Sequence, residues 1–490
     1  MTDLSRVRID GGSLRCEAVV RIARRHASVD LDPDAVVRAG RSHELAVDSC
    51  AKRAVYGRTT GVGANRHTVL DPATADQQGL LLLRSHAGGT GEPLPEDVVR
   101  ATLTIRLNQL AAGGSGVHPG LLQALETALR VGATPRVHSR GAIGTGDLTA
   151  LADVALTLAG ERPWATGALA PVTISPGDAL AFISSNAATL AAAVLAWSDL
   201  RRLLDASQAV AALSFVALGG STEAYSERVH SARPHPGSVH SAATMRNLLI
   251  GAEPPAPGRR LQDPYGLRAF PQIQGPALDA VDSLERVLTV DLNAAAENPL
   301  IDVTTEDVYH HGQFSTAYLA LTLDHLRAAV HHVAELSAAR LSDLVEPDLT
   351  GQAPFLAAGP AGSSGIMILE YVSHDALSQL RHSAAPVTLG TAVISRGLED
   401  HASFSTQAVR STVAATEAYR TVLACELLAA VRALRLTEAE LPATPLREAF
   451  ALAVGRLPLV AEDHSLSDEV LLAERLVEAL APYGATTRTG

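Results

Sequence analysis

Three long segments with almost no helix-breaking residues constrain the fold of this 490-residue chain most strongly. They are rich in alanine and leucine and run over residues 187–218, 316–345 and 406–434. Apolar residues in the second segment recur at helical spacing around Asp324, Arg327 and Glu335, as in an amphipathic helix. Because helices of about 30 residues exceed the usual length of about 11–12, the sequence predicts a mainly α fold with a bundle of long helices that oligomerises.

The rest of the chain is less regular. Residues 438–457 and 467–480 predict shorter amphipathic helices, and residues 7–9 and 302–308 predict small hairpins. Glycine-rich stretches at 57–63, 86–93, 111–120 and 141–148 interrupt short helical patterns in the first half, which indicates turns and close backbone approaches. We therefore expect a loop-rich N-terminal domain over 1–186 and a long-helix bundle domain over 187–490.

Composition excludes several classes of protein. Apolar residues make up 47% of the chain, so it is not disordered, and a net charge of −12 argues against nucleic-acid or anionic-membrane partners. The only lysine is Lys52, which almost excludes a lysine phosphate loop or a Schiff base. Three widely spaced cysteines predict neither a zinc site nor a disulfide framework. The N-terminus does not resemble a signal peptide, and no segment predicts a membrane span, so we expect a cytoplasmic protein.

Common cofactor and metal motifs are missing. The segment GVGANR (61–66) breaks the dinucleotide-binding spacing, and GSSG (362–365) is not a hydrolase nucleophile elbow. His325, His331 and His332 lack metalloprotease spacing and are interpreted as surface histidines near Glu335. No metal site is therefore predicted.

Several glycine-rich or polar segments each carry an unusual residue. Tyr56 begins YGRTTGVG, His86 lies in SHAGGTGEPLP, and GAIGTGDL spans 141–148. Four more segments follow in the second half: QDPYGLRAFPQIQG (262–275), AAENPL (295–300), HHGQFS (310–315) and SRGLEDHASF (395–404). In order and spacing this set resembles the aromatic amino-acid ammonia-lyase family, which comprises histidine, tyrosine and phenylalanine ammonia-lyases and aminomutases. The details look closest to the histidine ammonia-lyase branch.

The resemblance implies an internal electrophile, methylidene-imidazolone (MIO), which the family forms from an Ala-Ser-Gly tripeptide by cyclisation and loss of two waters. This chain departs from that pattern, because the aligned residues are Gly144, Thr145 and Gly146. Dehydration of threonine would place a methyl group on the carbon that must be attacked. A family asparagine that bonds the ring aligns with Ser184 in LAFISSNA (180–187), with Asn186 two residues later. We therefore expect no cofactor. The alternative is an MIO that forms autocatalytically from Gly144-Thr145-Gly146.

The resemblance also implies the roles of the remaining site residues. Tyr56 matches the general base, Tyr265 a second catalytic tyrosine, and Glu399 an acidic residue near the amine or the ring. Because a tyrosine has an ordinary pKa of about 10, we expect the site to lower the pKa of Tyr56. The expected substrate-binding residues are His86, Gln262, Arg268, Asn298 and Phe314. Arg268 would clamp the substrate carboxylate, for which a guanidinium is suited.

Three functions remain open. The first is an ammonia-lyase or aminomutase that makes an MIO-like group from Gly-Thr-Gly. The second, which we favour, is an enzyme without MIO that keeps the tyrosine base and carboxylate clamp for an elimination, addition or cyclisation on an amino-acid-like or carboxylate substrate. The third is a non-catalytic binding homologue. Both departures touch the cofactor and spare the base and clamp, which favours the second. The resemblance further implies a homotetramer with active sites shared between chains.

Overall fold

The computed structural model describes residues 6–71, 75–175, 177–251, 253–460 and 462–485, with only the backbone described at 75 and 76. The described chain forms two compact units, each made of three stretches. Unit 1 comprises 1–198, 284–323 and 386–410, and unit 2 comprises 199–283, 324–385 and 411–490. The stretches of the two units alternate along the sequence because the long helices contribute to both units. The division expected at residue 186 would instead give two consecutive domains.

The mainly α fold predicted from the sequence is confirmed. Three of its helices are α8 (Ala187–Leu218), α13 (Ala317–Val345) and α16 (Ser405–Leu436), which match the three breaker-free segments almost residue for residue. The predicted helix over 438–457 is shorter and forms α17 (Pro445–Val454), whereas 467–480 forms α18 (Ser467–Val477) and a 3-10 turn. A fourth long helix, α12 (Phe270–Leu292), was not predicted, because Pro276 interrupts its pattern.

Unit 1 contains the shorter helices of the N-terminal half. Among the helices of unit 1, α2 begins with a side-chain cap. The Asp32 side chain accepts a hydrogen bond from the backbone N–H of Asp34, and Pro33 lies in the first turn of the helix. Residues 99–111 of α4 are buried on every side, which makes α4 the central helix of the unit. The helices of unit 1 include α1 (Cys16–Arg25), α2 (Pro33–Lys52), α3 (Ala75–His86), α4 (Glu96–Ala111), α5 (Gly120–Val131), α6 (Leu148–Leu158) and α7 (Asp178–Ile183).

The strands of unit 1 form four two-stranded sheets. One hairpin was predicted correctly: β7 (Leu300–Asp302) pairs antiparallel with β8 (Asp307–Tyr309). The hairpin predicted at residues 7–9 is wrong, because β1 (Arg6–Ile9) pairs in parallel with β2 (Ser28–Leu31) across α1. The other two sheets pair β3 (Thr90–Pro93) with β5 (His138–Arg140) and β4 (Thr134–Pro135) with β6 (Trp164–Thr166).

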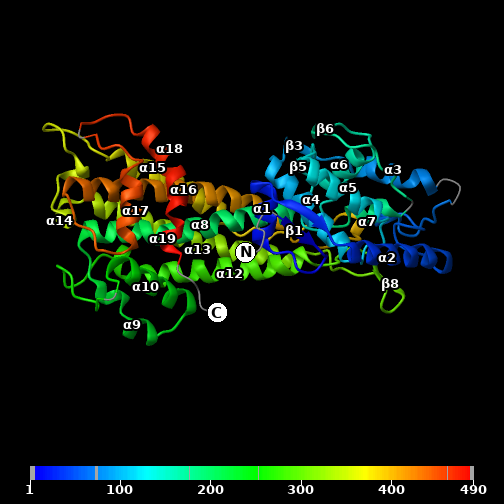
Figure 1. Cartoon of the computed structure of the whole chain (residues 1–490), viewed down its shortest axis with the longest axis horizontal. Coiled ribbons are helices and arrows are strands. Elements are labelled where there is room, and N and C mark those ends of the chain that lie inside the picture. The colour runs from blue at the N-terminus through cyan, green and yellow to red at the C-terminus, as the bar shows by residue number, and fades with distance from the viewer. Residues whose placement is uncertain (1–5, 72–74, 176, 252, 461, 486–490) are drawn as a thin grey trace. The chain divides into compact units, whose positions relative to one another are not determined.

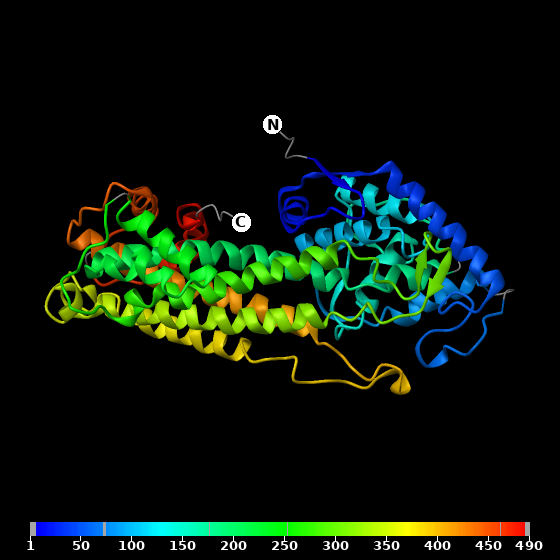
Figure 2. The ribbon, with the colours of Figure 1, turned by 90° about the horizontal axis from the view of Figure 1, so that it is seen from below.

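Unit 2 is a bundle in which α8, α13 and α16 lie side by side (Figures 1 and 2). A buried ionic network joins the three helices: the Glu426 carboxylate accepts hydrogen bonds from Ser214, Ser337 and Arg340, at 2.6–2.8 Å. The helical stretch Asp178–Leu218, which contains α7 and α8, is long and apolar enough to cross a membrane by length and composition, yet 94% of its most apolar window is buried inside the protein. Such burial is typical of a core helix.

Candidate active site

The Gly144–Thr145–Gly146 tripeptide lies where several helices of unit 1 begin. The helix α6 begins at Leu148, α8 at Ala187, α13 at Ala317 and α16 at Ser405. Hydrogen bonds link the tripeptide and Asp147 to residues at the starts of α8, α13 and α16. Because helix N-termini present unpaired N–H groups and partial positive charge, this arrangement favours negative charge at the tripeptide.

Three hydroxyl groups surround Gly144. Its carbonyl oxygen accepts hydrogen bonds from Thr316 Oγ1 and Ser403 Oγ, each at 3.2 Å, and Thr316 Oγ1 also lies 2.7 Å from Ser405 Oγ. Gly144 has a φ of +90°, and a Cβ there would overlap the Ser403 hydroxyl. Residue 144 is therefore restricted to glycine by both its backbone conformation and its neighbours. Thr145, which follows, is half-buried.

The sequence did not single out these hydroxyl residues, although a signal exists. Thr316 directly precedes α13, and Ser403 lies two residues before α16, where serine and threonine are typical of helix starts. Their approach to Gly144 depends on the long-range folding of α13 and α16, which local sequence does not report.

Asp147 connects the tripeptide to α8. Its carboxylate accepts hydrogen bonds from both the backbone N–H and the hydroxyl of Thr189, each at 2.7 Å. Its own N–H donates to the Ser185 carbonyl at 2.7 Å. Burial raises the pKa of Asp147 to about 6, although the Thr189 hydrogen bonds and Arg410 act in the opposite direction.

Ser184 and Asn298 contact each other next to Ser185, whose carbonyl bonds Asp147. The backbone N–H of Asn298 donates to Ser184 Oγ at 3.3 Å, and Asn298 Oδ1 accepts from the backbone of His311 at 3.0 Å. The neighbouring Asn186 donates from Nδ2 to the Phe314 carbonyl at 2.7 Å, two residues before Thr316. The structure therefore brings Ser184, Asn298 and Phe314 into one neighbourhood, as a shared site requires.

Tyr56 lies at a contact between two loops, 55–66 and 394–399. Its hydroxyl accepts a hydrogen bond from the Gly63 N–H at 2.6 Å, and Ser395 Oγ accepts one from the Ala64 N–H at 3.0 Å. Gly63, with a φ of +56°, has no room for a Cβ because Ser395 Oγ would lie 2.5 Å away. Figure 2 shows the segment before α16 as an extended loop.

The electrostatic surroundings of Tyr56 differ from the expectation. Burial raises the pKa of Tyr56, the nearby Glu399 raises it further, and only the Gly63 hydrogen bond and Arg66 lower it. The prediction that this site lowers the pKa is therefore wrong for the single chain, because desolvation of the phenolate outweighs those two opposing effects. Glu399 is close enough to Tyr56 to raise its pKa, and its expected place near the amine or the ring stays a prediction.

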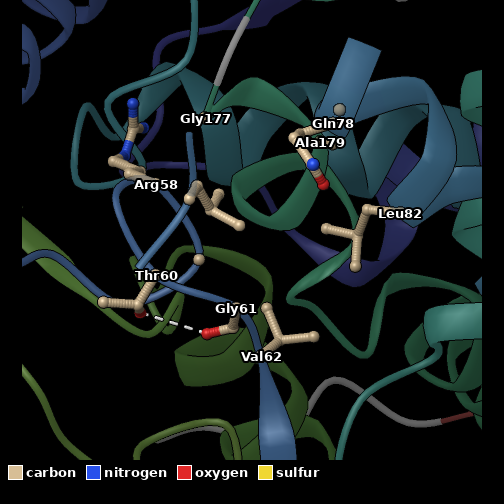
Figure 3. A pocket seen from close by; sticks show the side chains of 11 residues that line it. Arg58, Thr60, Gly61, Val62, Gln78, Leu82, Gly177 and Ala179 are labelled. Carbon is tan, nitrogen blue, oxygen red and sulfur yellow. Dashed lines mark hydrogen bonds between the residues drawn. The ribbon is translucent and has the colours of Figure 1, made fainter. Parts of the chain in front are cut away.

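His86 ends helix α3, one turn after Leu82, which lines a small cavity of unit 1. Its Nδ1 bonds the Leu82 carbonyl at 2.8 Å, which is an ordinary helix-terminal contact. The cavity, of about 60 Å³, lies between Leu82, the loop that follows Tyr56 and the start of α7, and Figure 3 shows Arg58, Gln78 and Gly177 around it. In the described residues the Nδ1 atom of His86 is thus committed to the backbone, which leaves Nε2 for a ligand.

The remaining predicted residues belong to unit 2. Tyr265 is 65% exposed at the start of the short helix α11 (Tyr265–Arg268), and Gln262 is also exposed. The Arg268 guanidinium lies 4.4 Å from the centre of the Tyr265 ring and donates from Nε to the Asp263 carbonyl at 2.9 Å. Tyr265 and Arg268 therefore form a preassembled pair, and within the described part of the chain the remaining guanidinium nitrogens are available to a carboxylate.

In one group of side chains that contains two histidines, the distances between the ligand atoms are short enough for a metal ion. The ligand atoms of His331, His332 and Glu335 on α13 lie within 4.8 Å of one another. The Glu335 carboxylate accepts from His332 Nδ1 at 3.0 Å, and His332 is exposed as predicted. A hydrogen bond between an exposed histidine and a carboxylate accounts for this geometry.

Comparison with known proteins gives one consistent result. The profile of the aromatic amino acid lyase family matches residues 14–455. A histidine ammonia-lyase of Treponema denticola is 34% identical over 492 residues, covering 96% of each chain.

Solved structures agree with that match. The crystal structure of the ergothioneine-degrading enzyme ergothionase from Treponema denticola, in complex with desmethyl-ergothioneine sulfonic acid, is 25% identical with a TM-score of 0.91, covering 97% of this chain and 99% of that one. The tyrosine aminomutase of Streptomyces globisporus is likewise 25% identical with a TM-score of 0.91, covering 97% of both chains.

Proposed function

This chain belongs to the aromatic amino acid lyase family and is a carbon–nitrogen lyase, and from that premise we propose that it eliminates an amine from an amino-acid-like carboxylate without MIO. The observation that carries the proposal is the Gly144–Thr145–Gly146 tripeptide. Glycine at position 144, to which the Ser403 hydroxyl restricts this residue, still permits cyclisation, but threonine at position 145 would place a methyl group on the carbon that must be attacked. These residues therefore fit the precursor of MIO poorly.

The proposed reaction needs only groups that this chain carries. The Tyr56 phenolate removes a proton from the β carbon, a double bond forms between the α and β carbons, and the electron pair of the breaking bond leaves with the amine. Arg268 binds the carboxylate, aided by Asn298. Glu399, close to Tyr56, faces the amine or the ring. The products are an α,β-unsaturated acid, the free amine and the proton on Tyr56.

Such a reaction suits a substrate whose amine leaves without being captured. Ergothioneine, named for one solved relative, carries three methyl groups on its α-nitrogen. A quaternary nitrogen has no lone pair to add to an electrophile, and it departs as a neutral tertiary amine. We therefore propose a histidine-like betaine as the substrate class, with His86 as one of the residues that bind it.

The MIO-dependent alternative has one observation in its favour. Two hydroxyl groups donate to the Gly144 carbonyl, and such donors polarise a carbonyl toward attack by a backbone nitrogen. The group would supply an electrophile for a free substrate amine. This alternative fits the histidine ammonia-lyases among the relatives.

Three measurements separate the possibilities: the intact mass, the ultraviolet absorbance of the product and thermal stabilisation by a bound ligand. The intact mass of the purified protein should equal that of the unmodified chain, and a mass lower by two waters would contradict the proposal. Ultraviolet absorbance should detect an unsaturated acid from ergothioneine or N,N,N-trimethylhistidine, and not from histidine. An unmodified protein that neither turns over nor binds any of these compounds would instead indicate a non-catalytic homologue, because a ligand of the folded state raises thermal stability.

A further inference from the structure

Arg268, the proposed carboxylate clamp, lies on the four-residue helix α11, which is too short to be stable on its own. Tyr265 is exposed and Arg268 is half-buried, whereas Gly266 and Leu267 between them are buried. The position of the Arg268 guanidinium therefore depends on the groups that hold the buried side of α11.

Arg340 of α13 holds α11 at Gly266. Its side chain is fully buried, and its Nη1 donates to the Gly266 carbonyl at 3.2 Å. A Cβ at residue 266 would lie 2.7 Å from the Arg340 Cγ, and such a close backbone approach needs glycine. The same guanidinium lies 5.1 Å from the centre of the Phe270 ring, at the start of α12. Arg340 thus contacts both α11 and the residue at which the next helix begins.

Glu426 of α16 in turn fixes Arg340. Arg340 donates from Nε to Glu426 Oε1 at 2.6 Å and from Nη2 to Glu426 Oε2 at 2.8 Å, which is a bidentate ion pair. Each carboxylate oxygen accepts one more hydrogen bond, Oε1 from Ser214 and Oε2 from Ser337. Because buried charges are stable only when they are paired and hydrogen-bonded, this network fixes the orientation of Arg340, with Nη1 directed to α11.

Tyr225 holds α11 one residue further along. It ends the 3-10 turn Thr222–Tyr225, is 1% exposed, and donates from its hydroxyl to the Leu267 carbonyl at 2.8 Å. Two successive carbonyls of α11 therefore accept hydrogen bonds from buried side chains of unit 2.

Asp263 holds the segment that precedes α11. Its carbonyl accepts from Arg268 Nε at 2.9 Å, and its carboxylate accepts from Arg260 Nε at 2.9 Å and from the Ser221 N–H at 2.5 Å. The backbone that carries Arg268 is thus anchored before α11 as well as within it.

We propose that Tyr225 and the buried Arg340–Glu426 pair are positioning residues for the carboxylate clamp. They hold α11 from its buried side, so that Arg268 meets the substrate carboxylate already oriented, and preorganisation of this kind increases affinity. The inference rests on the proposed role of Arg268 in binding a carboxylate. It rests neither on the proposed elimination nor on the chemical state of the tripeptide.

Binding of an unreactive carboxylate to the full-length protein, measured by isothermal titration calorimetry, tests this role. The probe is imidazolepropanoate, which has no amine to eliminate, and ethylimidazole is the same compound without its carboxylate. Tyr225→Phe removes only the hydroxyl that holds Leu267 and should weaken binding of imidazolepropanoate about threefold to tenfold. Binding of ethylimidazole should be the same in wild type and variant, because this probe has no group for Arg268 to bind.

Tyr419→Phe is the matched control. Tyr419 is also buried, and in the described part of the chain its hydroxyl makes no hydrogen bond to α11, so this variant should bind imidazolepropanoate like wild type. Hydrogen–deuterium exchange of residues 262–272 should be faster in Tyr225→Phe and unchanged in Tyr419→Phe. Arg340→Lys, which keeps a positive charge beside Glu426 but loses the guanidinium fork, replaces Tyr225→Phe if that variant does not fold.

Arg268→Ala separates the outcomes. Alone it should weaken imidazolepropanoate binding about tenfold or more, and adding Tyr225→Phe should cause no further loss, because Tyr225 acts through Arg268. If Arg268→Ala binds like wild type, or if wild type does not bind the probe, the proposed clamp fails and this inference fails with it. If Arg268→Ala binds weakly but Tyr225→Phe binds like wild type, or if the two losses add, only the positioning role is overturned.

Discussion

Tyr56 is half-buried, and its hydroxyl accepts a hydrogen bond from the Gly63 N–H at 2.6 Å. The motif around it predicted a base, but a motif carries no information on the burial of the hydroxyl. In one chain the phenolate is desolvated and lies near Glu399, so its pKa is raised. The proposed base form is therefore scarce near neutral pH, and the reaction should depend on the small fraction that ionises.

Replacing Tyr56 with phenylalanine should lower turnover about 10²–10⁴-fold while leaving the fold intact. In the wild type, kcat/KM should rise with pH toward the raised pKa of Tyr56, because the base is the deprotonated form. Tyr309→Phe provides a matched control, since that tyrosine is 43% exposed and its hydroxyl bonds Thr305. Equal activity of wild type and Tyr56→Phe on a substrate that turns over would disprove the assignment.

Gly144→Ala should destabilise the protein by about 2 kcal/mol or more, because the new Cβ overlaps the Ser403 hydroxyl and the φ of +90° is strained for alanine. Gly132→Ala is the control, with a φ of +72° and open space around it. It should lose only the backbone cost of about 1 kcal/mol. Denaturant unfolding measures both, and adding Ser403→Ala should recover part of the Gly144→Ala loss. Equal losses for the two alanine variants would remove the steric argument.

At the scale of elements, the long helices were the most predictable feature. Their apolar periodicity is a local property, so α8, α13 and α16 could be read directly. The helix α12 contains Pro276 and was missed, since its stability comes from packing of buried residues such as Val281 and Leu284. The parallel pairing of β1 with β2 likewise depends on contacts across α1 that no local pattern encodes.

Asp147 is a link between elements, because it follows the tripeptide and binds Thr189 in α8. Its pKa of about 6 lies above the ordinary value of 3.8, so the folded state binds its proton more tightly than the unfolded state. Its contribution to stability is thus greatest below pH 4 and is lost as the pH rises from about 4 to 6, by on the order of 3 kcal/mol.

Asp147→Asn should remove this part of the pH dependence. Urea unfolding at several pH values between 4 and 7, compared between wild type and variant, measures it. The free energy of unfolding of the variant relative to wild type should rise over this range, even if the loss of one hydrogen bond to Thr189 lowers it at every pH. A pH-independent difference would show that Asp147 is ionised in the folded protein with an ordinary pKa.

At the scale of the whole molecule, the sequence motifs identify a set of residues that one chain divides between its two units. Tyr56, Asn298 and Glu399 belong to unit 1, whereas Gln262, Tyr265 and Arg268 belong to unit 2. The order of motifs along a chain does not show which chains of an oligomer contribute residues to one active site. Exposed apolar side chains on the long helices, including Val290, Tyr318 and Leu321, favour association with further copies, and the homotetramer that the resemblance implied stays a prediction.

Subunit mixing tests a shared site directly. Tyr56→Phe and Arg268→Ala should each be inactive alone, because one lacks the base and the other the carboxylate clamp. If a site takes Tyr56 from one chain and Arg268 from another, mixed oligomers contain some sites with both residues intact, so co-expressed or refolded mixtures should regain part of the activity. Light scattering should show the tetramer in each sample. The control is a tetramer in which every chain carries both substitutions, and it should stay inactive. A tetrameric mixture of the two single variants that stays inactive would mean that each chain builds its own site.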